Sequence, residues 1–164
     1  LDFDLRRYGM LMLVGGGVGI TPVIGILKDL FLLPATEPPP PPCSSLQCVV
    51  VVWVLQQAKD AATFLDVLEQ CAARARESTG GALPNIVLRV HCTRAKAADI
   101  EHPLYTGRPA FGSILDDAAA QHSVKSTLIF ACGPTRMVES LWDMSSVRNS
   151  PSSRVDFHHE TFEF

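Results

Sequence analysis

The sequence has 164 residues, of which 47% are hydrophobic and 19% are charged. A chain of this length corresponds to one domain, and its apolar content excludes an intrinsically disordered protein. The formal net charge of −3 argues against a nucleic-acid-binding protein, because such proteins carry a basic excess. The 5 cysteines form no CxxC pair, so we predict neither a disulfide framework nor a metal site.

Residues 10–27 contain no charged side chain, and this length is close to the minimum for a membrane-spanning helix. Several glycines interrupt the segment, however, and make one continuous helix unfavourable. We therefore predict a buried strand at residues 10–14, a glycine turn and a helix at residues 21–32. Residues 34–45 hold half of the 12 prolines, which predicts an extended loop insertion, with an SH3-type ligand as the alternative.

The rest of the chain alternates apolar runs with segments of helical periodicity. We predict further strands at residues 48–55, 86–92, 127–131 and 155–158, and helices at residues 60–77, within 108–122, and at 134–144. Continuous apolar strands are typical of parallel sheets that are covered on both faces. The pattern therefore predicts an α/β fold, a doubly wound parallel five-stranded sheet flanked by helices.

The strongest functional signal is a glycine-rich segment at the predicted junction of the first strand and the first helix. Its notable residues are Gly15, Gly16, Gly17, Gly19, Thr21 and Pro22. Glycines permit a tight turn, and the helix N-terminus that follows attracts an anion such as a pyrophosphate. We expect Thr21 to cap the helix and Pro22 to lie in its first turn. The spacing is neither GxGxxG nor a P-loop, so a turn without a ligand is the alternative.

A second signal is Cys132-Gly133-Pro134, which follows the fourth predicted strand. Ligands of open parallel sheets bind at the carboxyl ends of the strands, so this segment and the glycine turn are expected to meet there. Taken alone, Cys132 also fits a small buried apolar residue.

Together, the glycine segment and the Cys-Gly-Pro segment resemble the NAD-binding domain of the ferric reductase and NADPH oxidase family, within the ferredoxin-NADP reductase superfamily. Val52-Trp53, Gly107-Arg108-Pro109 and the ending at residues 157–164 match the same branch. The resemblance covers nearly the whole chain except the proline-rich insertion. It implies a C-terminal fragment whose single domain spans residues 1–164, with flavin-binding and haem-containing membrane domains upstream.

The resemblance also implies roles for individual residues. The glycine segment, with Thr21 and Pro22, would hold the pyrophosphate, and Cys132, Gly133 and Pro134 would lie beside the nicotinamide. Arg108 and Arg94 would meet the 2′-phosphate of NADPH, since a guanidinium forms paired hydrogen bonds with phosphate. Each arginine also fits a solvated surface charge.

One position departs from the family pattern. Oxidases of this group often carry arginine three residues after the tryptophan of the second strand, where this chain has Gln56. This loss weakens the preference for NADPH, but neither Gln56 nor Gln57 is an acid that would bind a free ribose 2′-hydroxyl. We expect NADPH as the cofactor, with NADH as the alternative.

The C-terminal aromatics carry a further implication of the resemblance. In the superfamily a terminal aromatic stacks on the flavin, and either Phe162 or Phe164 could take this role. An end at Phe164 favours a ferric reductase, whereas Glu160-Thr161 is closer to oxidases. The alternative is that both phenylalanines are core residues of an edge strand. His158 and His159 are adjacent on a strand and would point to opposite faces, so we predict no iron site there.

The implied activity is transfer of hydride from NADPH to FAD and of electrons through haem to ferric chelate. A superoxide-producing NADPH oxidase is the first alternative, and a soluble reductase of the cytochrome b5 reductase type is another. A non-catalytic dinucleotide-binding regulatory module is the alternative from a different class. We expect a parent membrane protein with this domain on the cytoplasmic face, partnered by the flavin domain of the same polypeptide. The isolated chain is expected to be inactive.

Overall fold

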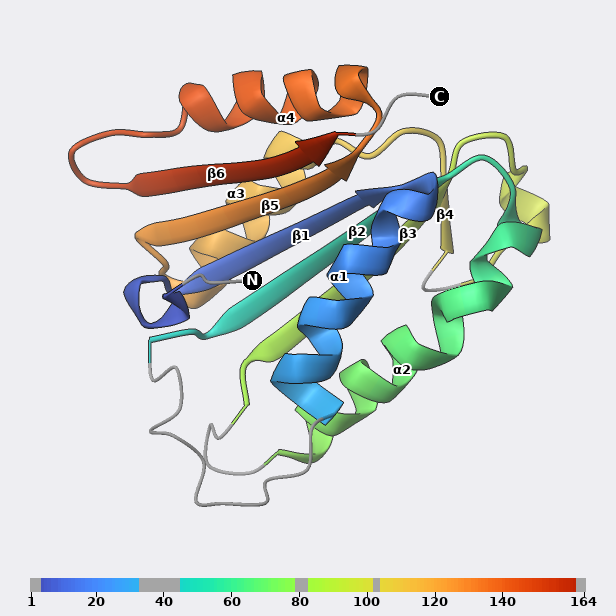
Figure 1. Ribbon diagram of the computed structural model, residues 1–164, viewed down its shortest axis with the longest axis horizontal. Coiled ribbons are helices and arrows are strands. Elements are labelled where there is room, and N and C mark those ends of the chain that lie inside the picture. Colours follow the sequence, from blue (N-terminus) through green and yellow to red (C-terminus); the bar gives the residue numbers. More distant parts are fainter. Residues whose placement is uncertain (1–3, 33–44, 79–82, 102–103, 162–164) are drawn as a thin grey trace.

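The computed structural model describes residues 4–32, 45–78, 83–101 and 104–161. All strands in these ranges form one sheet in the order β4-β3-β2-β1-β5-β6, and every neighbouring pair is parallel (Figure 1). The strands are β1 (Met10–Gly16), β2 (Cys48–Leu55), β3 (Asn85–Cys92), β4 (Leu104–Thr106), β5 (Ser126–Gly133) and β6 (Arg154–Thr161). The α-helices are α1 (Ile20–Leu27), α2 (Ala62–Glu77), α3 (Phe111–His122) and α4 (Thr135–Ser146).

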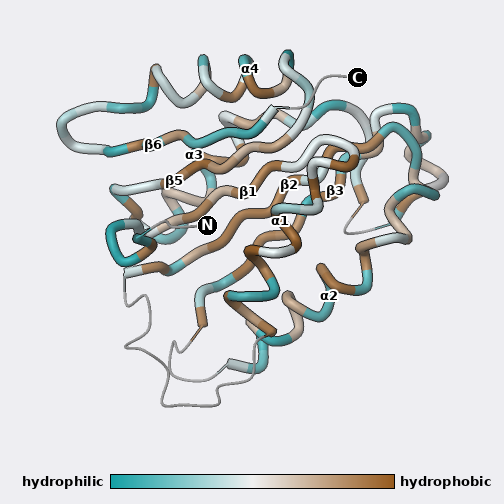
Figure 2. Tube along the Cα trace, viewed as in Figure 1, coloured by the Kyte–Doolittle hydropathy of each residue, from teal (hydrophilic) through white to brown (hydrophobic). Residues whose placement is uncertain are grey.

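The central strands are apolar on both faces because each face is covered by helices. Every residue of β1 is buried. Leu13, Val51 and Phe130 belong to a core with α1 and α2, whereas Met12 and Val50 belong to a second core with α3 and α4. Figure 2 shows the resulting colours, with the hydrophobic residues concentrated on the central strands. This two-layered burial confirms the predicted α/β fold with a parallel sheet flanked by helices.

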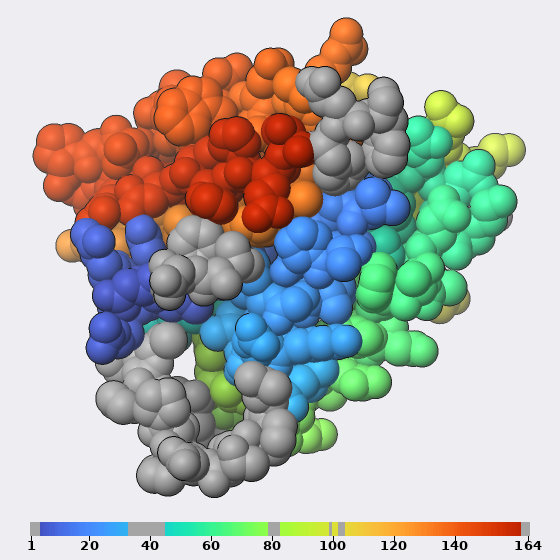
Figure 3. Space-filling model, viewed as in Figure 1, coloured from blue at the N-terminus to red at the C-terminus, as the bar shows by residue number. Residues whose placement is uncertain are grey.

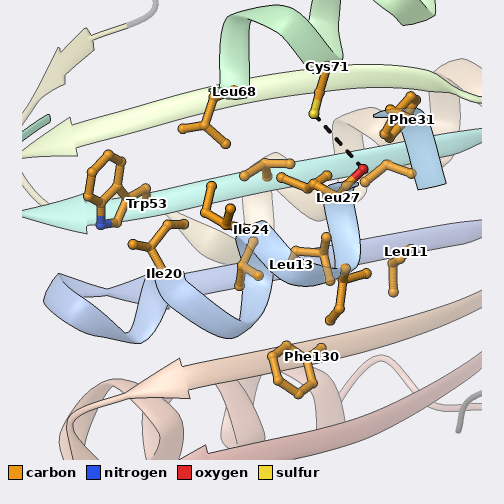
Figure 4. Packing of buried hydrophobic residues seen from close by; sticks show 14 of the residues in the cluster. Leu11, Leu13, Ile20, Ile24, Leu27, Phe31, Trp53, Leu68, Cys71 and Phe130 are labelled. Carbon is orange, nitrogen blue, oxygen red and sulfur yellow. Dashed lines mark hydrogen bonds between the residues drawn. The ribbon is translucent and has the colours of Figure 1, made fainter. Parts of the chain in front are cut away.

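The α1 helix fills the centre of one face. It continues through a π-helical turn at Lys28–Leu32, and Figure 3 shows it between β6 and α2. Ile20, Ile24 and Leu27 of α1 point into the core (Figure 4). The thiol of Cys71 in α2 lies 4.0 Å from the carbonyl oxygen of Leu27, which it meets in that core.

The apolar residues 10–27 form a strand, a 3-10 turn and a helix rather than one continuous helix, as predicted. The sheet has a sixth strand that was not predicted, because β4 is only three residues long and follows Pro103 directly. The proline-rich insertion expected at residues 34–45 lies outside the described residues except for its last residue, Ser45.

The order of the strands places a switch point beside β1. The chain moves from β1 outward to β2, β3 and β4 on one side, then crosses to β5 and β6 on the other. The connections therefore diverge at the carboxyl ends of β1 and β5, which leaves a crevice where ligands of such sheets bind.

Candidate functional site

A cleft of about 890 Å³ opens at this edge of the sheet. The lining includes Gly16, Gly17, Val18, Thr21, Trp53, Gln56, Asp60, Thr93, Arg108, Pro109, Phe111, Pro134, Arg136 and Met137. They come from the ends of the central strands and from the first turns of the surrounding helices. The volume lies in the upper part of the range of small-molecule sites.

The two segments singled out by the sequence pack against each other beside this cleft. A Cβ atom on Gly133 would lie 3.2 Å from the Cα of Gly16, and one on Gly16 would lie 2.9 Å from the Cδ of Pro134. A Cβ on Gly15 would lie 2.8 Å from the Cα of Ile20, so this glycine lets the strand turn directly into the helix. The glycines thus bring the carboxyl ends of β1 and β5 closer than side chains would allow.

Gly17 is needed for a different reason. Its φ of +56° lies in the left-handed region, although nothing would crowd a Cβ there. Its carbonyl oxygen accepts a hydrogen bond of 2.9 Å from the indole Nε1–H of Trp53. The end of β2 therefore holds the glycine turn in place.

The cap of α1 differs from the prediction. Gly19 is the N-cap and offers no side chain, while Thr21 already lies inside the helix, so the expectation that Thr21 caps it is wrong. The 3-10 turn at Gly17–Gly19 runs directly into α1 and moves the start of the helical backbone towards the glycines. Thr21 is exposed to the cleft, and Pro22 lies in the first turn as expected but does not line the cleft.

Cys132 is the last-but-one residue of β5 and pairs in register with Gly15. Its side chain is only 4% exposed and belongs to the core beside α1. Burial raises the pKa of this thiol, and the nearby Glu160 carboxylate raises it further. Cys132 is therefore a neutral thiol at the sheet edge, close to the cleft but not in its lining.

The cleft carries a positive charge in a chain that is negative overall. Arg108 and Arg136 line it, together with one carboxylate, Asp60. Neither arginine forms an ion pair with any other residue that the structure describes. Arg94 is exposed and its backbone N–H donates to Gln56, but its side chain is not part of the lining. The structure thus brings only one of the two predicted arginines to the cleft.

Sequence reasoning missed several lining residues. Arg136 and Met137 lie within three residues after the Cys-Gly-Pro segment, so their position in the first turn of α4 could have indicated them. Asp60 and Thr93 follow the ends of β2 and β3 and reach the cleft through the topology of the sheet. Phe162 and Phe164 lie outside the described residues.

No group of three or more His, Cys, Asp or Glu side chains in residues 4–32, 45–78, 83–101 and 104–161 is arranged to hold a metal ion. Among the same residues, none of the helices has the length and apolarity needed to cross a membrane. Ring contacts place His158 against Phe130 and His159 against Phe157, so the two histidines face opposite sides of the sheet.

A glycine turn at the switch point of a parallel sheet, beside a cleft whose two guanidinium groups pair with no carboxylate among the described residues, is the arrangement of a dinucleotide-binding α/β domain. Solved structures share this fold. Ferredoxin-NADP+ reductase from Plasmodium falciparum with 2'P-AMP matches 99% of this chain and 56% of its own, at a TM-score of 0.59 and 15% identity. Flavohemoglobin from Malassezia yamatoensis, with bound FAD and heme, matches 97% of this chain and 33% of its own, at a TM-score of 0.58 and 19% identity.

Sequence comparisons narrow the class. The model of the ferric reductase NAD binding domain matches residues 8–106, so the chain belongs to this family of oxidoreductase domains. NADPH oxidase 4 of Homo sapiens is 25% identical over 163 residues, which cover 95% of this chain and 27% of the oxidase. Respiratory burst oxidase homolog protein B of Oryza sativa subsp. japonica is 23% identical over 197 residues, covering 97% of this chain and 21% of that protein. The chain thus spans about a quarter or less of these relatives.

Proposed function

We propose that this chain is the NADPH-binding domain of a membrane reductase that passes electrons through FAD and haem to ferric chelate. The observation that carries the proposal is the cleft at the switch point, where the glycine turn and Arg108 face the same space. The fit rests on this chain's own groups: a glycine backbone that a ligand can approach closely, a helix start and two guanidinium groups. These are the groups that a phosphorylated dinucleotide requires.

In this proposal each group has a separate task. The turn at Gly15, Gly16, Gly17 and Gly19, with Thr21, holds the pyrophosphate through backbone N–H groups and the dipole of α1, and Pro22, which has no N–H to donate, shapes the first turn of that helix. Arg108 binds the 2′-phosphate, and Arg136 adds positive charge from the first turn of α4. Arg94 stands outside the cleft lining, so we propose for it only a weaker, long-range electrostatic contribution.

The segment Cys132, Gly133 and Pro134 would present the nicotinamide, and the bound NADPH supplies a hydride there. Gly133 packs against Met137 and the backbone of Gly16, which keeps this segment next to the glycine turn, and Cys132 is a neutral thiol beside it. We propose that Phe162 or Phe164 covers the flavin until the nicotinamide arrives.

The remaining machinery would belong to the parent polypeptide. Relatives that are about four times longer than the matched region support additional domains, and we propose flavin-binding and haem-containing membrane domains among them, with residues 1–164 as the NADPH-binding domain. The flavin domain would be its partner, and this domain would face the cytoplasm. The chain by itself would bind NADPH but neither retain FAD nor reduce iron.

Titration of the chain with NADPH and NADH tests the cofactor assignment. We expect tighter binding of NADPH, and Arg108→Ala should remove the difference between the two cofactors. Arg76→Ala is a matched control, because Arg76 is an exposed arginine in the last turn of α2, outside the cleft lining. Tighter binding of NADH that is unchanged in Arg108→Ala would overturn the assignment.

Dioxygen is the second candidate acceptor, and it is favoured by the NADPH oxidases among the relatives. The parent enzyme should be supplied with NADPH under two conditions, with ferric chelate in the absence of oxygen and with oxygen alone. Rapid formation of ferrous iron with ferric chelate in the absence of oxygen supports the reductase. Slow iron reduction under that condition, together with superoxide production when oxygen is supplied alone, supports the oxidase.

The Cys132→Ser substitution tests the role of the thiol. It should slow hydride transfer with either acceptor and leave dinucleotide affinity nearly unchanged. An unaltered transfer rate in Cys132→Ser would contradict the proposed role of Cys132, and a parent enzyme that binds NADPH without any hydride transfer would argue for a non-catalytic module.

A further inference from the structure

A buried histidine lies beneath the turn that carries Arg108. His91 is the last-but-one residue of β3, and it pairs in register with Val54 of β2, so it points to the side of the sheet covered by α3. Its side chain is 3% exposed. Neither the glycine turn nor the cleft lining includes it, so the proposed binding of NADPH does not by itself explain a buried polar ring here.

His91 contacts the backbone of the turn directly. Its Nδ1 atom lies 3.1 Å from the carbonyl oxygen of Gly107, the residue immediately before Arg108. A carbonyl oxygen only accepts hydrogen bonds, so Nδ1 carries the proton. Gly107 has a φ of +73°, in the left-handed region that glycine adopts readily. The bond from His91 therefore fixes the backbone from which Arg108 extends.

The ring of His91 is itself held in place. It stacks on Tyr105 of β4 at 5.2 Å between ring centroids and an angle of 14°, and the Arg89 guanidinium lies 4.2 Å from the centre of the same tyrosine ring. The Nε2 atom of His91 is buried, and no described residue provides it with a hydrogen-bond partner. Burial lowers the pKa of His91 and the Arg89 charge lowers it further, although the Gly107 bond opposes both. A neutral ring with its proton on Nδ1 is the form that suits this environment.

We infer that His91 is a positioning residue that sets selectivity for a 2′-phosphate, by fixing the turn 107–109 so that the Arg108 guanidinium stays in the cleft. The inference rests on the proposed function, in which Arg108 binds that phosphate. A histidine placed only for packing would need the shape of the ring but not the donor at Nδ1.

Two substitutions separate these roles. The amide nitrogen of Asn occupies nearly the position of Nδ1 and can donate to Gly107, whereas the amide of Gln lies nearer the position of Nε2. The chain carrying His91→Asn, His91→Gln or Arg108→Ala would be titrated with 2′,5′-ADP and with 5′-AMP, which differ only in the 2′-phosphate. The readout is the affinity for 2′,5′-ADP divided by the affinity for 5′-AMP, because a general loss of structure lowers both affinities together.

We expect His91→Gln to lower the ratio about threefold to tenfold, the range of one net hydrogen bond, and His91→Asn to stay within about twofold of the wild type. If Arg108→Ala lowers the ratio but His91→Gln does not, the positioning role is overturned while the proposed role of Arg108 stands. If Arg108→Ala leaves the ratio unchanged, the proposed role of Arg108 fails, and the inference fails with it. Equal ratios for the Asn and Gln variants would also overturn the positioning role.

A measurement on the unaltered chain remains decisive if the variants do not fold. Nitrogen-15 NMR of the imidazole distinguishes the two neutral tautomers of His91. A protonated Nδ1 in slow exchange with water supports the inference. A proton on Nε2 overturns it, since the bond to Gly107 would then be absent.

Discussion

The indole Nε1–H of Trp53 donates a hydrogen bond of 2.9 Å to the carbonyl oxygen of Gly17. Trp53 is 2% exposed near the end of β2, and it pairs in register with Gly15, two residues before the acceptor. Its ring also meets the edge of Phe64 in α2 at 6.1 Å between centroids. The strand next to β1 thus holds the proposed pyrophosphate turn in its left-handed conformation, which couples core packing to the cleft.

Trp53→Phe should weaken dinucleotide binding as well as the fold. Phenylalanine keeps an aromatic ring against Phe64 but removes the donor to Gly17, so we expect a loss of about 1–3 kcal/mol in the free energy of unfolding, including the smaller ring. Calorimetric titration with NADPH should show at least a severalfold lower affinity. Trp142→Phe is the control, because Trp142 is 55% exposed on α4 and does not line the cleft. Equal affinities for the Trp53 and Trp142 variants would contradict the proposed coupling.

Gly133→Ala should destabilise the fold, because its Cβ would lie 2.5 Å from the Cε of Met137 and 3.2 Å from the Cα of Gly16. The methionine can move but the backbone of Gly16 cannot, so we expect a cost of about 1–3 kcal/mol in urea unfolding. Gly25→Ala is the control, since a Cβ there meets nothing within 4 Å and Gly25 lies in α1. That substitution should stabilise the chain by about 0.5–1 kcal/mol. A Gly133→Ala chain as stable as the wild type would show that the two segments are not packed as described.

The stability of the chain should fall below neutral pH through His91. Its pKa is lowered in the fold, while in the unfolded chain it is near the ordinary value of about 6.5. Between these two values the unfolded state binds more protons, so this contribution to stability is fully present above pH 6.5 and is lost as the pH falls towards the folded pKa. The free energy of unfolding, measured from pH 7.5 to pH 5, should decrease more steeply in the wild type than in His91→Asn. Parallel curves would contradict a neutral buried His91.

The Cys132 thiol should be unreactive in the folded chain. Burial and the nearby Glu160 both raise its pKa, so little thiolate is present at pH 8, and its 4% exposure restricts access. Iodoacetamide labelling, followed peptide by peptide with mass spectrometry, should be slow in buffer and fast in urea. Glu160→Gln should speed native labelling modestly, whereas Glu139→Gln on α4 should not. Native labelling at the rate of an unfolded peptide would contradict the buried, neutral thiol.

Much of the fold was predictable because its main signals are local. The sequences of β1 and β2 are continuously apolar, which indicates strands that are buried on both faces. The glycines at residues 15–17 indicate the turn between the first strand and the first helix. The short β4 escaped prediction because its pairing with Val90 and Cys92 is a tertiary contact. The predicted N-cap of α1, Thr21, was wrong because a 3-10 turn begins at Gly17 and leads into the helix, and no capping side chain marks that turn in the sequence.

The cleft was predictable only in part, for a related reason. Gly16, Gly17, Thr21, Arg108 and Pro134 carried signals in their own segments and do line it. Arg136, Asp60 and Thr93 reach the cleft because the ends of parallel strands converge there, and that convergence depends on strand order. Likewise, the bond between His91 and Gly107 joins residues 16 positions apart, and nothing in their local sequence indicates it.

The most direct test of the proposed site uses the two tryptophans of the chain. Each gives one indole N–H signal in a proton–nitrogen NMR spectrum, Trp53 from the cleft and Trp142 from α4, outside the cleft lining. On titration with NADPH, the Trp53 signal should shift until saturation, while the Trp142 signal should stay in place. Saturable NADPH binding that leaves Trp53 unmoved and shifts Trp142 would show that the dinucleotide binds elsewhere, and would contradict the proposed site.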